Sequence, residues 1–334
     1  MDPPQPRVYG IGNPLIDILV DVEDHDLSLL GLHKGTMHLI SSDRRMELLD
    51  FIDGKPVSYR CGGSCPNTMI TLSACGIPSA IAGMVGNDRF GSIYRKNLQS
   101  LKVSDALKSF DAPTGSSIIL VTPDCERTMN TYLGANRYFS PEDVDEATLA
   151  GSDLFHFTGY MWDTENQKQA IMKGMSIAHR SGTRISFDIA DPFAVSRNRE
   201  AFLSIITDHA DVVFANSEEA RILFDRYDPY ECAKSLGRRC RIGVVKAGRN
   251  GSYIASEDKI LRIPAYPCTP VDTTGAGDIY ASGFLYSLMH GFTLGVCGRI
   301  ASYLASQIIE EHGAQFSLDS LEKIKKILEK ETWN

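Results

Sequence analysis

Short apolar runs rich in Val, Ile and Phe alternate with amphipathic segments along most of the chain. The apolar runs predict buried strands at residues 8–11, 80–85, 153–157, 185–189, 212–215 and 242–245. The amphipathic segments predict helices near residues 64–75, 91–101, 165–181, 197–208 and 230–239, and the chain becomes mainly helical from Gly275 onward. This order predicts an α/β doubly wound fold, with a mainly parallel sheet and helices on both of its faces.

Two stretches interrupt this alternation, namely residues 14–41 and about 113–133. Both carry a two-residue alternation without a crossover helix, as in Ile16, Ile18 and Val20. They are therefore expected to pair as a small separate sheet. The pattern alone leaves open whether this sheet is a lid over the strand ends or a set of extra edge strands.

Charge and composition narrow the class of partner. The net charge is −8 and no run of Lys or Arg is longer than Arg238-Arg239, so nucleic acid and anionic membranes are not expected partners. The first six residues lack the basic start and apolar stretch of a signal peptide, which predicts a cytoplasmic protein. The eight cysteines have no CxxC spacing and fit reduced thiols better than disulfides or a zinc site.

Two common nucleotide-binding motifs are not present. Residues 10–15 read GIGNPL, in which Leu15 replaces the third glycine of a dinucleotide fingerprint and Pro14 interrupts the turn. The sequence also has no GxxxxGK[ST] loop. A bound phosphate therefore needs a different cradle.

The segment DTTGAGD at residues 272–278 is the best candidate for that cradle. Gly275, Ala276 and Gly277 open a predicted helix, so several backbone N–H groups and the helix dipole converge on one point. Asp278 lies in the first turn, where we expect its carboxylate to be ionised and to act as the base for a hydroxyl group. The alternative is a glycine-rich turn in which Asp278 is only a helix-start charge.

A second glycine cluster, CGGSCPN at residues 61–67, opens another predicted helix. Gly63 allows close backbone approach, and the Asn67 amide can bond vicinal hydroxyls, which suits a polyol ligand. A tight turn before a helix is the alternative interpretation.

The segment NSEE at residues 216–219 follows a predicted buried strand. An amide and a carboxylate thus emerge at the carboxyl end of a strand, where doubly wound sheets bind ligands. Asn216 and Glu219 suit a hydrated Mg²⁺ held through few protein oxygens. The same four residues also make a good helix N-cap.

These motifs together resemble the PfkB, or ribokinase-like, carbohydrate and nucleoside kinases. The resemblance rests on DTTGAGD, on the glycine pattern that runs from Gly62 to Gly91, and on Asn216-x-x-Glu219. It extends over nearly the whole chain and implies a ribokinase-like fold with a small β-sheet lid. We therefore predict one domain over residues 1–334, with lid segments at about 14–41 and 113–133.

Within that family the segments at 12–17, 127–136 and 190–193 look most like adenosine kinases. The resemblance implies an ATP- and Mg²⁺-dependent phosphotransfer to the 5′ hydroxyl of adenosine, with Glu219 acting on Mg²⁺ through water. The resemblance also implies that Arg127 neutralises the transferring phosphoryl group and that Phe193 stacks on the base. The ribose hydroxyls would be bound by Asp17, Gly63 and Asn67, and ATP would be bound by Asn216, Gly248, Gly251 and Thr274.

The sequence leaves the acceptor, the oligomeric state and a monovalent cation site open. Lys246 stands where many members of the family have Thr, and Cys65-Pro66 departs from the usual pair before the asparagine. A sugar kinase of the ribokinase or fructokinase type is therefore the alternative, and a monomer and a homodimer are both compatible with the sequence. The resemblance also implies a possible K⁺ site near Asp272, Thr274 and Gly313.

Overall fold

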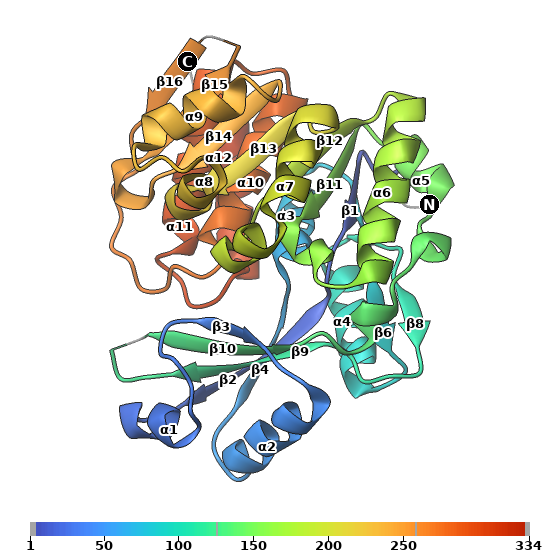
Figure 1. The fold of residues 1–334 in the computed structure, drawn as a ribbon, viewed down its shortest axis with the longest axis vertical. Helices are drawn as coiled ribbons and strands as arrows, with labels where there is room; N and C mark the ends of the chain where they lie inside the picture. Colours follow the sequence, from blue (N-terminus) through green and yellow to red (C-terminus); the bar gives the residue numbers. More distant parts are fainter. Residues whose placement is uncertain (1–4, 125, 258, 331–334) are drawn as a thin grey trace.

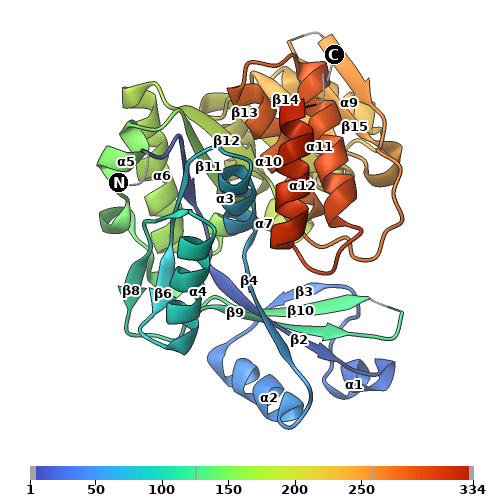
Figure 2. The same ribbon diagram turned by 180° about the vertical axis from the view of Figure 1, so that it is seen from behind.

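The computed structural model describes residues 5–124, 126–257 and 259–330. Residues 1–4, on which the signal-peptide interpretation partly rests, lie outside this range. Figures 1 and 2 show a large α/β body with a smaller sheet below it. Among the described residues, no helix is both long and apolar enough to cross a membrane.

The described strands form a nine-stranded sheet that runs through the large body. In spatial order these strands are β16 (Lys259–Ile263), β15 (Ser252–Ser256), β14 (Ile242–Lys246), β13 (Val212–Asn216), β12 (Arg184–Asp188), β11 (Leu154–Thr158), β1 (Val8–Ile11), β5 (Ser79–Ala82) and β7 (Ser104–Asp105). Pairing is parallel from β7 to β14 and antiparallel at β15 and β16. All six predicted strands are present, which confirms a mainly parallel sheet.

Helices cover both faces of this sheet, as Figures 1 and 2 show from opposite sides. One face carries α3 (Ser64–Ala74), α4 (Arg89–Ser100), α10 (Ala276–Met289), α11 (Leu294–Ile308) and α12 (Leu318–Lys330). The other carries α5 (Glu146–Ala150), α6 (Glu165–Ser181), α7 (Pro192–Asp208), α8 (Ser217–Phe224) and α9 (Pro229–Gly237). Alternate strand residues divide between the two cores: Val212 and Phe214 pack on one face, and Val213 packs on the other.

The two segments that interrupt the alternation do form a smaller sheet, together with a third segment that lies between them in the sequence. Its order is β3 (Met37–Leu39), β10 (Arg127–Tyr132), β9 (Ser116–Val121), β2 (Leu15–Asp21) and β4 (Ser58–Gly62). Two helices, α1 (Asp24–Leu29) and α2 (Ser42–Ile52), belong to the same region. Strand β4 was not predicted. It pairs with β2 from Leu15 opposite Gly62 to Leu19 opposite Ser58, and it leads directly into α3.

Two sequence predictions need local revision. The predicted strand 80–85 is two strands, β5 and β6 (Met84–Gly86), divided at Gly83, where an added Cβ would lie 2.4 Å from the Gly12 carbonyl oxygen. Strand β6 pairs separately with β8 (Lys108–Phe110). The helix predicted at 197–208 is the second part of α7, which starts at Pro192 and is kinked at Asn198, where φ is −128° and ψ is 25°. The first part, which was not predicted, is capped by the Asp191 side chain, which accepts a hydrogen bond from the Ala194 amide.

Candidate active site

The cradle predicted at residues 272–278 is a loop that leads into α10. Gly275 is the N-cap of α10 and has φ of 76°, and an added Cβ there would lie 2.7 Å from Ala314. The position therefore requires glycine on both conformational and steric grounds. Asp278 is the third residue of the helix, so its carboxylate lies at the positive end of the helix dipole.

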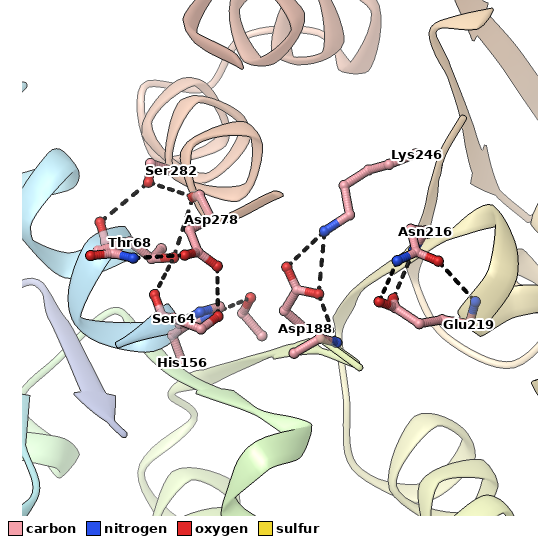
Figure 3. Close-up of polar contacts among 12 residues, drawn as sticks. Ser64, Thr68, His156, Asp188, Asn216, Glu219, Lys246, Asp278 and Ser282 are labelled. Carbon is pink, nitrogen blue, oxygen red and sulfur yellow. Dashed lines mark hydrogen bonds and ion pairs between the residues drawn. The ribbon is translucent and has the colours of Figure 1, made fainter. Parts of the chain in front are cut away.

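The Asp278 carboxylate accepts hydrogen bonds from two neutral donors in the first turn of α3, and Figure 3 shows one of them, Ser64. The Ser64 hydroxyl donates to Oδ1 at 2.6 Å, and the Asn67 amide donates to Oδ2 at 2.9 Å. The Ser282 and Thr68 hydroxyls donate to the backbone carbonyl of Asp278 at 2.7 and 3.3 Å. Helices α3 and α10 thus hold the carboxylate in one orientation. Ser64 was not singled out from the sequence.

The protonation of Asp278 differs from the sequence expectation of a carboxylate that is simply ionised. Burial raises its pKa to about 7, against the hydrogen bonds from Ser64 and Asn67, which lower it. The nearby Asp188 carboxylate raises it further, while Lys246 lowers it. A carboxyl group with this pKa can accept a proton near neutral pH and release it again, as a general base must do in each cycle.

Asn67 is held on its other side by a residue far along the chain. Gln315 donates through Nε2 to Asn67 Oδ1 at 3.0 Å and to the Cys61 carbonyl oxygen at 2.7 Å. This contact fixes the amide so that its NH₂ group faces Asp278. Gln315 carried no signal in the sequence, because a polar residue in a loop has no recognisable pattern.

The glycine pair before α3 permits two close approaches. An added Cβ would lie 2.4 Å from Asp17 Oδ2 at Gly62 and 2.1 Å from the Asn13 carbonyl oxygen at Gly63, where φ is 111°. The Asp17 carboxylate of β2 is therefore packed directly against the glycine loop. Burial raises the pKa of Asp17 to about 7, although Arg127 and Arg60 act to lower it.

The other end of the cradle contacts the smaller sheet. Arg127, in β10, forms an ion pair with Asp272 and donates to the Thr274 hydroxyl at 3.0 Å. Asp272 also accepts hydrogen bonds from the backbone amides of Gly313, at 2.6 Å, and Thr274, at 3.0 Å. Burial acts to raise the pKa of Asp272, but these amides and Arg127 outweigh it, so the pKa lies below its usual value.

Asn216 and Glu219 form the capping arrangement that was the alternative interpretation of their motif. The Glu219 amide donates to Asn216 Oδ1 at 2.8 Å, and the Glu219 carboxylate accepts from the Asn216 backbone amide at 2.7 Å and side-chain amide at 2.6 Å. The Glu219 side chain is buried, and burial raises its pKa. Both residues nevertheless lie at the carboxyl end of β13, as the sequence predicted.

A further ion pair lies at the carboxyl ends of the two strands that flank β13. Lys246 ends β14 and Asp188 ends β12, and Lys246 Nζ donates to both carboxylate oxygens of Asp188, at 2.9 and 3.3 Å. Figure 3 shows this pair between Asp278 and the Asn216–Glu219 cap. Asp188 was not among the sequence candidates, although it ends a predicted strand in the same way as Asn216.

Three predicted ligand-binding residues are placed at the same edge by their elements alone. Phe193 is in the first turn of α7 and is 54% exposed. Gly248 and Gly251 have φ of 54° and 87° and form the turn between β14 and β15. Among the described residues, none of the three is hydrogen-bonded to Asp278, Asp272 or Glu219. Their roles remain predictions.

Comparison with known proteins places this arrangement in context. The sequence pattern described as "pfkB family carbohydrate kinase" matches residues 37–321. The structure is similar to adenosine kinase from Sinorhizobium meliloti, with 35% identity, a TM-score of 0.90, and coverage of 97% of this chain and 99% of that one. It is equally similar to a probable sugar kinase from Rhizobium etli, with 34% identity, a TM-score of 0.91 and the same coverage. By sequence, 92% of this chain aligns with 96% of a 5-dehydro-2-deoxygluconokinase from Halalkalibacterium halodurans, at 25% identity over 323 residues.

Proposed function

Because the chain belongs to the pfkB family of carbohydrate kinases, with a ribokinase-like α/β fold, we propose that it transfers the γ-phosphoryl group of ATP to the 5′ hydroxyl of adenosine. The observation that carries this proposal is the environment of Asp278. Its carboxylate lies at a helix N-terminus, is held by Ser64 and Asn67, and has a pKa raised to about 7. A buried base next to an anion cradle is what hydroxyl phosphorylation requires.

In the proposed reaction Asp278 accepts the proton of the attacking hydroxyl as the new O5′–P bond forms. The bond between the γ-phosphorus and the bridging oxygen breaks, ADP leaves, and Asp278 then loses its proton to solvent. The Ser64 hydroxyl, 2.6 Å from Asp278 Oδ1, shows that a hydroxyl donor can reach this carboxylate at short range. The substrate hydroxyl would take an equivalent position at the carboxylate.

The backbone N–H groups at residues 275–278 would receive the γ-phosphoryl group, and Arg127 would neutralise its charge. Mg²⁺ would supply charge neutralisation between the phosphate oxygens of ATP. Among the described residues there is no cluster of three or more His, Cys, Asp or Glu side chains that could hold a metal ion. Glu219, at the carboxyl end of β13, would then act on a metal held mainly by ATP oxygens and water.

The acceptor would lie between the smaller sheet and the carboxyl edge of the large one. Asp17 and Asn67 would bind the 2′ and 3′ hydroxyls, Gly63 would allow the ribose to approach the backbone, and Phe193 would stack on the base. Residues 14–41 and 113–133 would then act as the lid that excludes water. Each of these roles is proposed from the family resemblance and from the position of the residue in the fold.

A sugar kinase is the second candidate. It is favoured by the 34% identity to a probable sugar kinase over 97% of this chain, which equals the similarity to an adenosine kinase. Phe193 distinguishes the two candidates, because a free sugar has no base on which an aromatic ring can stack. The cysteines do not distinguish the two candidates. All seven described ones are unpaired thiols, which suits a cytoplasmic enzyme of either kind.

The test compares kcat/KM for adenosine, inosine, ribose and fructose in the wild type and in Phe193→Ala. Stacking on a base is worth ~1–3 kcal/mol, so the variant should lose roughly ten- to hundred-fold in kcat/KM for adenosine. Phe292→Ala is the matched control, because Phe292 is 41% exposed and lies beyond the far end of α10. If ribose or fructose outperforms adenosine on the wild type, or if Phe193→Ala retains adenosine turnover, the acceptor is a sugar.

A further inference from the structure

The Lys246–Asp188 ion pair has no part in the mechanism described above, yet it lies inside the site. The side chain of Lys246 is 15% exposed and that of Asp188 is 4% exposed. Removing both charges from water costs several kcal/mol per ion, and a hydrophobic pair of similar size is often as stable or more stable. A contribution to stability therefore does not explain why this ion pair is present in the site.

The position of Lys246 relative to the cradle is more informative. Its Nζ would lie 3.2 Å from a Cβ added to Gly277, so the ammonium group is packed beside the second glycine of the cradle. The Asp278 and Glu219 carboxylates are also close enough to interact with it electrostatically. Lys246 thus lies beside the point at which the N-terminus of α10 would receive a phosphoryl group.

The concentration of carboxyl groups in this region favours a cation beside them when ATP binds. Asp188, Asp278 and Glu219 are three carboxyl groups at one edge of the sheet, and the γ-phosphate adds further negative charge. Arg127 also supplies positive charge at the cradle, but it comes from the smaller sheet and is already paired with Asp272. Lys246 belongs to the large sheet, so its charge is in place whatever the position of the lid.

We propose that Lys246 is a phosphoryl-binding residue of this enzyme, which donates to the γ-phosphate oxygens of ATP while it keeps its ion pair with Asp188. Asp188 is then a positioning residue that keeps the ammonium group extended toward Gly277 in the nucleotide-free enzyme. An ammonium group has three N–H donors, of which Asp188 accepts two, so one remains for the phosphate and neither buried charge loses its partner. This inference rests on the proposed ATP-dependent function, but it does not depend on the acceptor.

The competing explanation is that the pair only holds β12 and β14 in place. Lys246→Met alone cannot decide, because it leaves the buried Asp188 carboxylate without its partner and destabilises the fold for that reason. The double variant Lys246→Met/Asp188→Asn removes both charges with little change in volume. It should therefore fold, and its thermal unfolding temperature should lie closer to that of the wild type than does the temperature of the single variant.

The decisive measurement is the ratio of two dissociation constants, for ADP and for a non-hydrolysable ATP analogue, by calorimetry in the presence of Mg²⁺. Loss of a preorganised donor to a transferring group typically lowers the rate by ~10²–10³. Part of this factor should appear as a lower affinity for the ATP analogue. We expect the double variant to lose about ten- to hundred-fold in affinity for the ATP analogue, with ADP affinity changed less than about three-fold. Lys246→Arg should keep the wild-type ratio within about three-fold, because it keeps the charge.

Lys173→Met is the control for a half-buried lysine elsewhere, since Lys173 donates to the Pro141 carbonyl oxygen at 2.8 Å. A double variant that folds and keeps the wild-type ratio would overturn the proposal and assign the pair to the fold. Failure of the double variant to fold would lead to the same conclusion. If wild-type protein binds neither nucleotide, the proposed kinase function fails and the role of Lys246 fails with it.

Discussion

The two ends of the cradle carry the same residue in opposite environments. Asp272, at the start of the segment, pairs with Arg127 and accepts two backbone amides, and its pKa lies below the usual value. Asp278, six residues later, is buried between the neutral donors Ser64 and Asn67, and its pKa is raised to about 7. One carboxylate is therefore a permanent anion near neutral pH, and the other can exchange a proton.

This difference shows how one loop can divide two tasks. An arginine and direct amide contacts make Asp272 suited to hold the smaller sheet against the cradle. Asp278 is bonded by neutral donors and is buried, and the nearby Lys246 charge does not offset that burial, so its carboxyl group can act on a substrate proton. If this division is correct, changes at the two ends should have different kinetic consequences.

The largest effect is expected from Asp278→Asn. The change keeps the size of the side chain and removes the base, so kcat should fall by ~10²–10⁴ with little change in nucleotide affinity. Steady-state kinetics together with nucleotide binding by calorimetry would measure both quantities. Retention of more than about a tenth of wild-type kcat, where chemistry limits turnover, would contradict the assignment of the base.

At the other end of the cradle, Arg127→Met should cost ~10–10³ in kcat, because it removes a charge that the proposal places on the transferring phosphoryl group. It also leaves Asp272 with only its amide donors, so the pKa of Asp272 should move up. Lys34→Met is the matched control in the smaller sheet's region, where Lys34 pairs with Asp24 and Asp124. Equal effects of the two changes on kcat would show that Arg127 serves only to attach the lid.

A pH profile separates the two carboxylates. Asp278 must be deprotonated to act, and its pKa is about 7 in the nucleotide-free enzyme, as is that of Asp17, which the proposal places on the acceptor. The kcat/KM for the acceptor should therefore rise with pH and level off above pH 7, and the part of the rise that Asp17→Asn keeps belongs to Asp278. At one pH unit below that pKa about a tenth of the enzyme is competent, so the loss there is roughly ten-fold. Asp272 contributes nothing in this range because its pKa is low. A profile that is flat from pH 6 to pH 8 would contradict the raised pKa.

The same comparison explains what the sequence could and could not reveal. DTTGAGD indicated an anion cradle with a base because glycine position, helix start and acidic residue are local properties of one segment. The six apolar runs likewise predicted the parallel strands of the large sheet. The sequence predicted an ionised Asp278 and could not reveal its raised pKa or the ion pair of Asp272, because Ser64 and Arg127 are brought to these residues only by the fold.

Other omissions have the same physical origin. Strand β4 is short and its first three residues are exposed, so it lacks an apolar pattern, and its pairing with β2 joins residues about 40 positions apart. Gln315 reaches Asn67 across 248 positions, and Lys246 reaches Asp188 across 58. Such long-range side-chain contacts leave no trace in a local pattern, although each end can be found once strand ends are known to meet at one edge.

The smallest effect is predicted for a monovalent cation at the Asp272 end. The family resemblance implies a K⁺ site near Asp272, Thr274 and Gly313, but the Asp272 carboxylate is already engaged by Arg127 and by the amides of Thr274 and Gly313. A cation there would therefore be held mainly by backbone carbonyl oxygens and would act on the cradle through its field. A charge near a helix terminus is worth ~0.3–1 kcal/mol, which corresponds to roughly a two- to five-fold higher kcat in K⁺ than in tetramethylammonium. The measurement compares K⁺, Na⁺ and tetramethylammonium salts at equal ionic strength, with the pH held above the pKa of Asp278 so that its titration adds nothing. Equal rates in all three would mean that Arg127 and the amides already neutralise this end of the cradle, and the comparison between its two ends would then need no added ion.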